Sequence, residues 1–467
     1  MTHRILVVGA GAAGLLAAGR AAECGGDVLL LEKMTEVGKK ILVSGKERCN
    51  LTNSAPLEEF LRYYGRNGRF LHNAFHRFFR PELLALLARY GVETQVERGG
   101  RIFPASGRAS DVRDALLRYA RDQGAILRTN TPVRELVLAD GHITGVRVNQ
   151  AEFLPADAVI LTTGGASWVA TGSTGDGYRM AQAVGHTIEP LRPALVPLTV
   201  KARAHAKAVQ GVSLRNVRCT LLAARPGKPL KPLKPPYPIP PTGELLFTHF
   251  GVSGPLVLTL SLAAVDALRA GKAVTLAIDL KPGMTAAEVH TRLQREFETH
   301  AQRRLPHLLR SWVPGSLADL LAELSGIAPE RPVHTIRAEE RERLAQLLKD
   351  FRWEITGALP LEAGMVTAGG VALNEVAPIT FASKVAPGLY LAGEVLDLAA
   401  DTGGFNLQAA FSSGYLAGEA AAHAVTQLQQ DLRKYQEPNR RERREQKENF
   451  YKVLFQHLGT TEIVFSR

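Results

Sequence analysis

The chain has 467 residues, of which 45% are hydrophobic and 22% are charged, and this composition excludes a disordered or fibrous protein and predicts two or three globular domains. Its 57 Lys and Arg exceed its 45 Asp and Glu and leave a formal net charge of +12, which favours anionic partners such as RNA or nucleotides, with a solvated basic surface as the alternative. Cys24, Cys49 and Cys219 lie far apart and form no CxxC pair, which excludes a disulfide framework and fits a reducing cytosol.

The N-terminal segment predicts a strand, a glycine turn, a helix and a second strand. Residues 5–8 form an apolar run that ends at Gly9, residues 12–24 are rich in Ala and Leu, and residues 28–31 form a second apolar run that ends at Glu32. This order is a βαβ unit. The first run is too short for a signal peptide and no apolar stretch is long enough to span a bilayer, so we expect a soluble, cytoplasmic protein without a membrane partner.

The remaining elements alternate between two kinds of pattern. Helical patterns occur at residues 81–90, 111–123, 285–351 and 406–425, and strand patterns at residues 133–138, 145–148, 158–162, 364–371 and 388–392. Short β-type runs between residues 197 and 280 predict a small barrel or sandwich. This stretch also holds eight prolines between Pro226 and Pro241, interleaved with Lys228, Lys231 and Lys234, which we expect to form an exposed polyproline-type loop outside any sheet ladder.

These patterns predict an α/β fold whose Rossmann-like FAD-binding domain is discontinuous. We expect its two parts at residues 1–190 and 351–428, with an inserted β-barrel-like domain at residues 191–284 and an inserted helical subdomain at residues 285–350. The chain would end in a basic tail at residues 429–467, which contains Arg433, Lys434, Arg440, Arg441, Arg443, Arg444 and Lys447. Such a run of like charges is usually solvated.

Residues 9–14, Gly9-Ala10-Gly11-Ala12-Ala13-Gly14, match GxGxxG between the predicted strand and helix. In that context the motif predicts a dinucleotide site: Gly9 permits a tight turn, Gly11 lets the backbone approach a pyrophosphate, and Gly14 lets helix and strand pack closely. The helix N-terminus offers N–H groups to the phosphates. Glu32 can accept ribose hydroxyls, and an acidic residue at this position favours FAD or NAD over NADP.

A second glycine-rich cluster favours FAD over NAD. Residues 393–397 and 402–408 follow a short predicted strand and precede a predicted helix, although an ordinary strand-to-helix turn is the alternative for this cluster by itself. The N-terminus of that helix could face the pyrimidine ring of a flavin and stabilise the negative charge of its reduced form. No second GxGxxG is present, so we expect the electron donor NAD(P)H to bind only transiently over the flavin.

A third cluster, residues 38–53, combines cations, small residues and amides just after the second strand. It offers three cations for phosphates, Lys39, Lys40 and Arg48, and three polar side chains for ribityl hydroxyls or the ring edge, Ser44, Asn50 and Asn53. The alternative is a basic surface loop.

Taken together, these motifs resemble the BaiN/RdsA-type bacterial NAD(P)/FAD-dependent oxidoreductases, also described as aminoacetone-oxidase-like flavoproteins. The resemblance covers about residues 4–422 and is carried by residues 9–14, 40–53, 246–255, 366–371 and 388–408. The family pattern often reads Ser-Gly-Gly-Gly-Arg-Cys-Asn, where this chain has Lys46 and Glu47 in place of two glycines.

The resemblance implies a flavin domain of the glutathione-reductase type that carries an inserted barrel and helical subdomain. It also implies reduction of a carbon–carbon double bond conjugated to a carbonyl. Motifs and resemblance together predict FAD contacts at Gly9, Gly11, Ala13, Gly14, Glu32, Lys33, Lys40, Ser44, Gly45, Arg48, Cys49, Asn50, Asn53, Val133, Thr163, Gly164, Gly393, Glu394, Asp397, Gly403, Gly404, Asn406 and Leu407.

Such a reduction needs a protein acid that protonates the carbon next to the one receiving hydride. Cys49 is one candidate, with a thiol tuned by Arg48 and Lys46, and His249 in the inserted domain is the other; a structural role is the alternative for both. His72 and His76 are spaced i, i+4 but have no evident acidic third ligand, so no metal site is predicted.

Two substrates follow from the charge and the resemblance. The first is a uracil of large-subunit ribosomal RNA, reduced to dihydrouridine after it is splayed into the flavin cleft, with the basic residues binding phosphates. The second is a small hydrophobic enone such as a steroid, for which the charge is incidental. A non-catalytic, flavin-bound RNA-binding factor is a third interpretation, and a monomer is compatible with all three.

Overall fold

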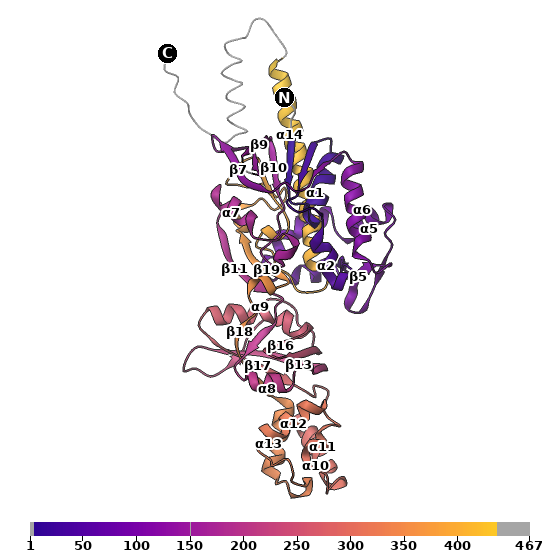
Figure 1. The fold of residues 1–467 in the computed structure, drawn as a ribbon, viewed down its shortest axis with the longest axis vertical. Coiled ribbons are helices and arrows are strands. Elements are labelled where there is room, and N and C mark those ends of the chain that lie inside the picture. Colours follow the sequence, from indigo (N-terminus) through magenta and orange to yellow (C-terminus); the bar gives the residue numbers. More distant parts are fainter. Residues whose placement is uncertain (1–3, 150, 437–467) are drawn as a thin grey trace.

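The computed structural model describes residues 4–149 and 151–436 and shows three bodies stacked along one axis (Figure 1). The uppermost body holds a five-stranded parallel sheet in the order β20-β10-β1-β2-β6. Its strands are β1 (Arg4–Val8), β2 (Asp27–Leu31), β6 (Ile126–Arg128), β10 (Ala158–Leu161) and β20 (Leu389–Leu391). The central strands are short apolar runs buried on both faces, as is typical of parallel sheets covered by helices.

The sheet joins segments that lie far apart in the sequence. Strand β10 pairs with β1 on one side and with β20 on the other, in parallel registers that align Leu161 with Val8 and with Leu391. All carboxyl ends therefore meet at one edge of the sheet. The glycine turns after β1 and β20, about 380 residues apart by the numbering of Gly9 and Gly393, lie at that edge together.

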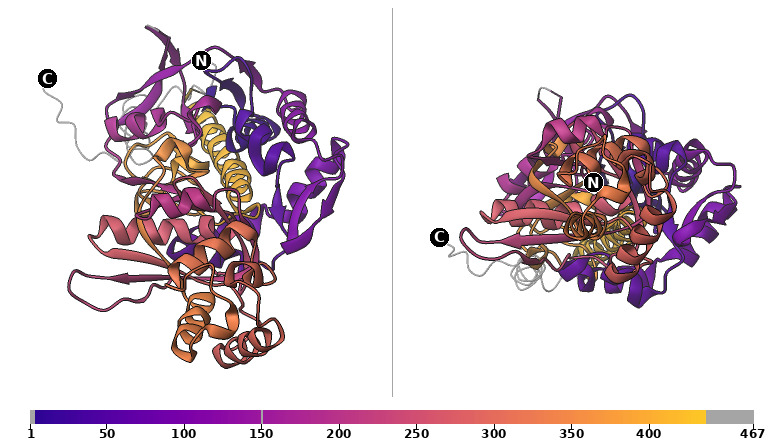
Figure 2. Two further views of the ribbon diagram at one scale, coloured as in Figure 1. Left: turned by 60° about the horizontal axis from the view of Figure 1, so that its bottom comes forward. Right: turned by 90° about the horizontal axis from the view of Figure 1, so that it is seen from below.

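Helices α1 (Ala12–Glu23) and α14 (Phe405–Gln436) pack against each other over this sheet, as two views show (Figure 2). A Cβ atom at Gly414 would lie 2.2 Å from the carbonyl oxygen of Ala13, and one at Gly418 would lie 2.3 Å from that of Ala17. The helices are therefore parallel and in backbone contact. In this register the first residue of α14 lies eight residues before the level of Ala12, the first residue of α1. The N-terminus of α14 therefore extends about 12 Å beyond the N-terminus of α1 along the shared axis.

Smaller elements complete the upper body. They are α2 (Lys39–Glu47), β3 (Thr52–Asn53), α3 (Leu57–Arg62), the 3₁₀ helix η1 (Gly65–Leu71), α4 (His72–Arg77), α5 (Arg80–Arg89), β4 (Thr94–Val96), β5 (Arg101–Pro104), α6 (Ala109–Asp122), β7 (Val133–Ala139), β8 (His142–Val148), β9 (Glu152–Pro155) and α7 (Asp176–Ala183). The predicted helices at residues 81–90 and 111–123 and the predicted strand pair near residues 133–148 are confirmed, the pair as the antiparallel strands β7 and β8.

The second body is a closed antiparallel barrel. A two-stranded stalk, β11 (Ile188–Ala194) paired with β19 (Val366–Val371), connects it to the upper body. The barrel strands are β12 (Leu198–Val200), β13 (Ser213–Ala224), β15 (Gly243–Thr248), β16 (Gly251–Ser253), β17 (Ala273–Asp279) and β18 (Phe351–Ala358), with β14 (Lys231–Pro232) at an edge. The ring closes because β13 pairs with both β15 and β17. Helices α8 (Arg203–Ala208) and α9 (Pro255–Arg269) contact it.

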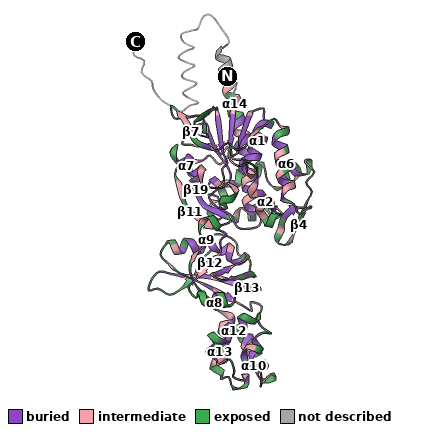
Figure 3. Cartoon of the chain, in the orientation of Figure 1, coloured by how far each residue is buried: buried purple, intermediate pink, exposed green. Residues whose placement is uncertain are grey.

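The third body is a cluster of helices between β17 and β18 at the bottom of Figure 1. It consists of α10 (Ala286–Thr299), α11 (Leu305–Leu309), α12 (Gly315–Leu324) and α13 (Ala338–Lys349). Its buried side chains, among them Leu293, Leu308 and Leu344, form one apolar core with the barrel. Burial is concentrated on the strands and on the inward faces of the helices (Figure 3).

Three predictions on element boundaries are wrong. Strand β18 completes the barrel by pairing with β12 and β17, so residues 351–358 do not belong to the second part of the FAD-binding domain. The proline-rich segment does enter the sheet, because Lys231 and Pro232 pair with β13 as β14, at an edge where a missing N–H is tolerated. Helix α14 continues to Gln436, past the predicted helix end at residue 425 and into the predicted basic tail.

The rest of the predicted basic tail, residues 437–467, lies outside the described residues. No helix within the described ranges is both long and apolar enough to cross a membrane.

The helix contact yields a stability prediction. Alanine has the higher intrinsic helix propensity, so Gly→Ala in a helix is ordinarily stabilising. At Gly418 the new methyl group would instead meet the carbonyl of Ala17, and we expect Gly418→Ala to destabilise the protein by about 1–3 kcal/mol through overpacking. Thermal unfolding followed by circular dichroism measures this.

The matched control is Gly315→Ala in α12, where the nearest atom to a new Cβ is 3.9 Å away. We expect this variant to be unchanged or slightly more stable. An equal or higher melting temperature for Gly418→Ala would contradict the close contact between α1 and α14.

Candidate functional site

The site begins where the loops after β1, β10 and β20 converge. Gly9 has a φ of +99°, and a Cβ there would lie 2.8 Å from the carbonyl oxygen of Thr162. A Cβ at Gly393 would lie 2.9 Å from the Cβ of Ala13. Side chains are excluded at both glycines, so the backbones of three distant segments meet. The predicted residues Gly9, Ala13 and Gly393 are thus brought together.

The N-terminus of α1 faces open space. No heavy atom lies within 4 Å of the position that a Cβ of Gly11 would take, and no side chain caps the helix there. Gly14, by contrast, packs so closely that a Cβ would overlap the carbonyl oxygen of Gly9. A cradle of N–H groups beside empty space fits a pyrophosphate, because the N–H groups and the helix dipole both favour an anion.

Glu32 stands at the end of β2 beside this cradle. Its two carboxylate oxygens accept hydrogen bonds from the backbone N–H groups of Ala10 and Met34, each at 2.8 Å. The N–H of Thr131 donates to the carbonyl of Glu32, which brings the start of β7, with Val133, to the same place. The carboxylate is therefore oriented at the position where a Rossmann-type fold binds an adenosine ribose.

Lys33 is directed elsewhere. Its ammonium group donates to Thr174 Oγ1 at 2.6 Å and to Asp176 at 2.5 Å, at the start of α7. The side chain therefore links two loops, and we assign no phosphate contact to it.

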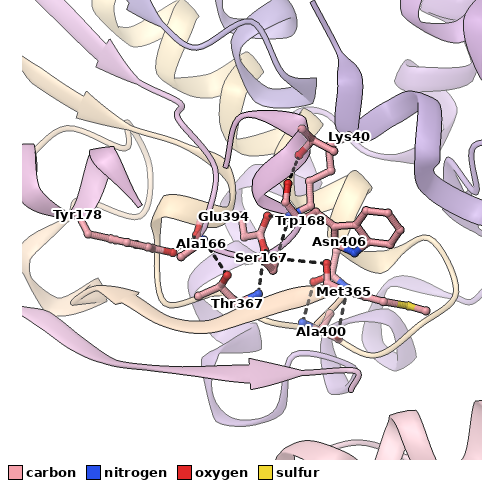
Figure 4. Close-up of polar contacts among 11 residues, drawn as sticks. Lys40, Ala166, Ser167, Trp168, Tyr178, Met365, Thr367, Glu394, Ala400 and Asn406 are labelled. Carbon is pink, nitrogen blue, oxygen red and sulfur yellow. Dashed lines mark hydrogen bonds and ion pairs between the residues drawn. The ribbon is translucent and has the colours of Figure 1, made fainter. Parts of the chain in front are cut away.

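A polar network centred on Glu394 joins the second glycine-rich cluster to the third cluster, residues 38–53 (Figure 4). Its carboxylate accepts hydrogen bonds from the N–H of Thr367 at 2.8 Å and from Ser167 Oγ at 3.3 Å, and it forms an ion pair with Lys40. Lys40 also donates to Ser167 Oγ at 3.2 Å. Lys40 and Glu394 are 354 positions apart, so this pair ties the two predicted clusters together.

Three members of this network were missed from the sequence: Ser167, Thr367 and Tyr178. Thr367 Oγ1 accepts from the N–H of Ala166 at 2.9 Å, and the hydroxyl of Tyr178 donates to the carbonyl of Glu394 at 3.1 Å. Thr163 and Gly164 precede this group directly after β10, and Thr163 Oγ1 is buried without a hydrogen-bond partner. The available signal was the position of Ser167 in the loop after a predicted strand and of Thr367 within the predicted strand at residues 364–371.

The N-terminus of α14 forms the other end of the site. Gly404 has a φ of +97°, and a Cβ there would lie 2.4 Å from the carbonyl oxygen of Thr52. Asn53 donates to the carbonyl of Gly403 at 3.1 Å, and the side-chain oxygen of Asn50 accepts from the N–H of Gly404 at 3.1 Å. The third cluster therefore reaches the N-terminus of α14, a contact that the sequence did not predict.

Two buried polar atoms near this helix end lack partners, Thr52 Oγ1 and Gln408 Oε1. Buried polar atoms are ordinarily hydrogen-bonded, so orphaned atoms here fit the polar edge of a bound ligand. Together with the cradle at Gly11 and the carboxylate of Glu32, they fit an extended dinucleotide with a polar ring at its far end. The roughly 12 Å offset of the two helix N-termini separates a phosphate position from a ring position.

The side-chain amide of Asn406 does not point toward the proposed dinucleotide position. Its nitrogen donates to the carbonyls of Ala400 and Asp401 at 3.0 and 3.1 Å, and its oxygen accepts from the N–H of Ala400 at 2.9 Å. The side chain therefore shapes the preceding loop. The neighbouring Leu407 is partly buried against the core of the upper body.

Two buried carboxylates lie in this loop. Asp397 accepts from the N–H of Gly369 at 3.0 Å and from Asn67 Nδ2 at 3.1 Å. Asp401 accepts from Thr259 Oγ1, on α9 of the barrel, at 2.9 Å and from the N–H of Thr402 at 2.6 Å. Burial raises the pKa of Asp401 to about 6, against the effect of these hydrogen bonds.

The tuning predicted for Cys49 is wrong. Its side chain is fully buried, and desolvation raises the pKa of its thiol to about 12, although a hydrogen bond with Ser44 opposes the shift. Arg48 forms an ion pair with Glu97 and lies over the ring of Phe103 at 4.4 Å. Because burial outweighs any nearby charge, Cys49 stays protonated and packs beside the site.

Ser44 makes a local hydrogen bond to the carbonyl of Ile41 at 2.7 Å, at a kink in α2. The residues after it, Gly45, Lys46, Glu47 and Cys49, all have φ between 58° and 64°. Lys46 and Glu47 thus keep the left-handed backbone that the family pattern assigns to glycine, at a cost of about 1–2 kcal/mol each.

His249 is exposed in the turn between β15 and β16, with its ring against Phe250 at 4.9 Å. Among the described residues, no hydrogen bond or ion pair connects it to the Glu394 network or to the α14 N-terminus. The structure therefore does not bring His249 together with the other predicted site residues.

Comparison with known proteins places this geometry in a family. Residues 3–420 match the family described as the HI0933-like protein Rossmann domain. The chain is 36% identical over 427 residues to the 3-dehydro-bile acid delta(4,6)-reductase of Clostridium scindens, covering 90% of this chain and 99% of that protein. It is 28% identical to the ribosomal RNA dihydrouridine synthase of Escherichia coli, covering 88% and 96%.

Among solved structures, the 3-ketosteroid-delta4-(5alpha)-dehydrogenase of Rhodococcus jostii, in complex with 4-androstene-3,17-dione, aligns with a TM-score of 0.47. The alignment has 15% identity and covers 90% of this chain and 97% of that one.

The open space at Gly11 yields a cofactor prediction. Because no atom lies within 4 Å of a new Cβ and the backbone is extended, Gly11→Val should fold normally. The branched side chain would fill the pyrophosphate cradle, so we expect the purified variant to lose most of its bound flavin. Absorbance spectra of the folded protein, with circular dichroism as a check on folding, measure this.

Gly283→Val is the control, since a Cβ at that loop position also meets nothing within 4 Å and lies outside the site. It should keep its flavin. A yellow, fully loaded Gly11→Val protein would show that the cradle does not hold the phosphates.

The buried acid Asp401 yields a pH prediction. Its folded-state pKa of about 6 lies above the ordinary value of 3.8, so the folded state binds the proton more tightly than the unfolded state. Stability should therefore fall as pH rises from about 4 to about 6, by about 3 kcal/mol in total. Asp401→Asn removes this titration, so its stability relative to wild type should increase by about that amount between pH 4 and 7.

Chemical denaturation at several pH values measures the difference. Asp122→Asn, at an exposed position, is the control for the same substitution at the surface. A constant Asp401→Asn difference would show that folding does not raise the pKa of Asp401.

Proposed function

The chain belongs to the HI0933-like Rossmann family and is an oxidoreductase, and we propose that it uses bound FAD to reduce a carbon–carbon double bond conjugated to a carbonyl. The observation that carries the proposal is the meeting of two helix N-termini, an oriented carboxylate and the Lys40–Glu394 pair along one edge of the sheet. FAD, when bound there, supplies the two-electron hydride chemistry that such a reduction requires.

The residues of the chain have separate tasks in this arrangement. The N-terminus of α1 and Gly11 would hold the pyrophosphate, and Glu32 the adenosine ribose. The N-terminus of α14, with Thr52 and Gln408 beside it, would face the ring, where its partial positive charge stabilises the anionic reduced form. The Glu394 network orients the loops between these two ends.

The reaction type is supported by the names of the relatives. One is a reductase of a delta(4,6) bile acid and another a synthase of dihydrouridine, and both names describe saturation of a carbon–carbon double bond. In a 3-oxo-delta(4) steroid and in a uracil this bond is conjugated to a carbonyl, which makes one carbon accept hydride and its neighbour a proton.

We infer that NAD(P)H is a transiently bound electron donor, because the chain contains a single GxGxxG motif and the proposed FAD site already uses it. The donor would then bind transiently next to the flavin ring. A uracil in ribosomal RNA is one candidate substrate, favoured by the net charge of +12. A small hydrophobic enone is the other, favoured by the higher identity to the bile acid reductase.

An anaerobic experiment on the holoenzyme tests the proposal. Flavin reduced by NADH or NADPH should be reoxidised by 4-androstene-3,17-dione or by a transcript of large-subunit ribosomal RNA, and mass spectrometry should show two added hydrogens on the product. Ribosomal RNA from a strain lacking the gene decides between the substrates, since loss of a dihydrouridine identifies the RNA. A reduced flavin that is reoxidised by dioxygen alone would contradict the proposal.

A further inference from the structure

We propose that residues 62–69, at the end of α3 and in η1, form together with the proline-rich segment a cationic rim that binds the phosphates of an RNA strand beside the flavin end of the site. The rim is defined as Arg62, Arg66 and Arg69 together with Lys231 and Lys234. The inference rests on the proposed function, because it concerns how a substrate RNA would be held at that same site.

The two segments of the rim meet directly. A Cβ at Gly65, the first residue of η1, would lie 3.3 Å from the carbonyl oxygen of Pro236. The next residue, Tyr237, is buried, and its hydroxyl donates to the carbonyl of Ala399 at 3.1 Å. The proline-rich segment is thus anchored on the loop that leads into α14, and its stiff backbone holds the lysines in place.

The rim borders the ring end of the proposed flavin site. Asn67, between Arg66 and Arg69, donates to the carbonyl of Asp397 at 2.7 Å. Tyr63, next to Arg62, accepts from the N–H of Asp401 through its carbonyl and stacks on Phe405, the first residue of α14, with 4.0 Å between ring centroids. A strand bound on the rim would therefore lie next to the site where a base is to be reduced.

The five cations of the rim are exposed and available. In the part of the chain that the structure describes, none of them makes an ion pair or a side-chain hydrogen bond. Arg20 and Arg77, by contrast, are bound to Glu419. Glu58 and Glu59, which precede Arg62 on α3, are exposed carboxylates in the first turn of that helix, where they interact favourably with the helix dipole.

An unpaired cationic surface fits a polyanion rather than an uncharged steroid. Lys and Arg side chains bind successive phosphates of a nucleic acid by neutralising them and releasing counterions. A single-stranded segment fits best, since a base to be reduced must be splayed out of its stack.

The test uses the flavin-loaded full-length protein and fluorescein-labelled oligouridylate as the probe, with binding measured by anisotropy over a series of salt concentrations. The variants are the triple Arg62→Gln, Arg66→Gln, Arg69→Gln and the double Lys231→Gln, Lys234→Gln. Each lost phosphate contact should reduce the slope of log K against log[salt] by about 0.7. The triple should therefore lower the slope by about 2 and weaken binding at low salt at least about tenfold.

The control is the triple Arg295→Gln, Arg303→Gln, Arg343→Gln, which removes three exposed arginines from the helical body at the far end of the molecule. It should leave the slope unchanged. An equal decrease of the slope in the rim and control variants, or no decrease in the rim variants, would overturn the proposed rim. Binding to vesicles of anionic lipid in place of the oligouridylate would also overturn it.

Flavin content and reduction of 4-androstene-3,17-dione separate this inference from the proposed function. Both should be unaffected in the rim variants. A wild-type protein that binds RNA through the rim but reduces no double bond would leave the rim standing and remove the proposed reaction. An active enzyme whose RNA binding is unchanged in the rim variants would support the proposed reaction and contradict the rim.

Discussion

The backbone contact between α1 and α14 is the constraint on which the rest of the site depends. Gly414 and Gly418 bring α14 against the carbonyls of Ala13 and Ala17, so the two helices run parallel at a distance that no side chain would permit. Their N-termini therefore point to the same edge of the sheet. The register sets the offset between them, and with it the distance between a phosphate end and a ring end.

The Glu394 network depends on this contact, because Glu394 lies in the segment between β20 and α14 and reaches the third cluster there. There Lys40 neutralises the carboxylate while Ser167 and the N–H of Thr367 bond its oxygens. A partly buried charge is tolerated when it is paired and hydrogen-bonded in this way. The pair consequently connects the loops that surround the cofactor position, and not merely two points on the surface.

The barrel is coupled to this framework through a few contacts around the loop before α14. Thr259 on α9 bonds Asp401, and Tyr237 of the proline-rich segment bonds Ala399. The inserted body thus contacts the upper one at the ring end of the site rather than at the adenosine end. In the proposed site, the Rossmann-like part would hold the phosphates and the inserted part would border the ring, where the substrate would bind.

The sequence by itself determined the βαβ unit and the close packing of Gly9 and Gly14, because these depend on local spacing within about 30 residues. It also determined the family, because several motifs along the chain occur in one order. It also indicated the amides Asn50 and Asn53. It did not determine that Cys49 is buried with a raised pKa, that Asn406 bonds its own loop, or that Ser167, Thr367 and Asp401 belong to the site. Burial and hydrogen-bond partners depend on which distant segments pack together, and only the tertiary structure, through the strand order and the contact of α1 with α14, decides that.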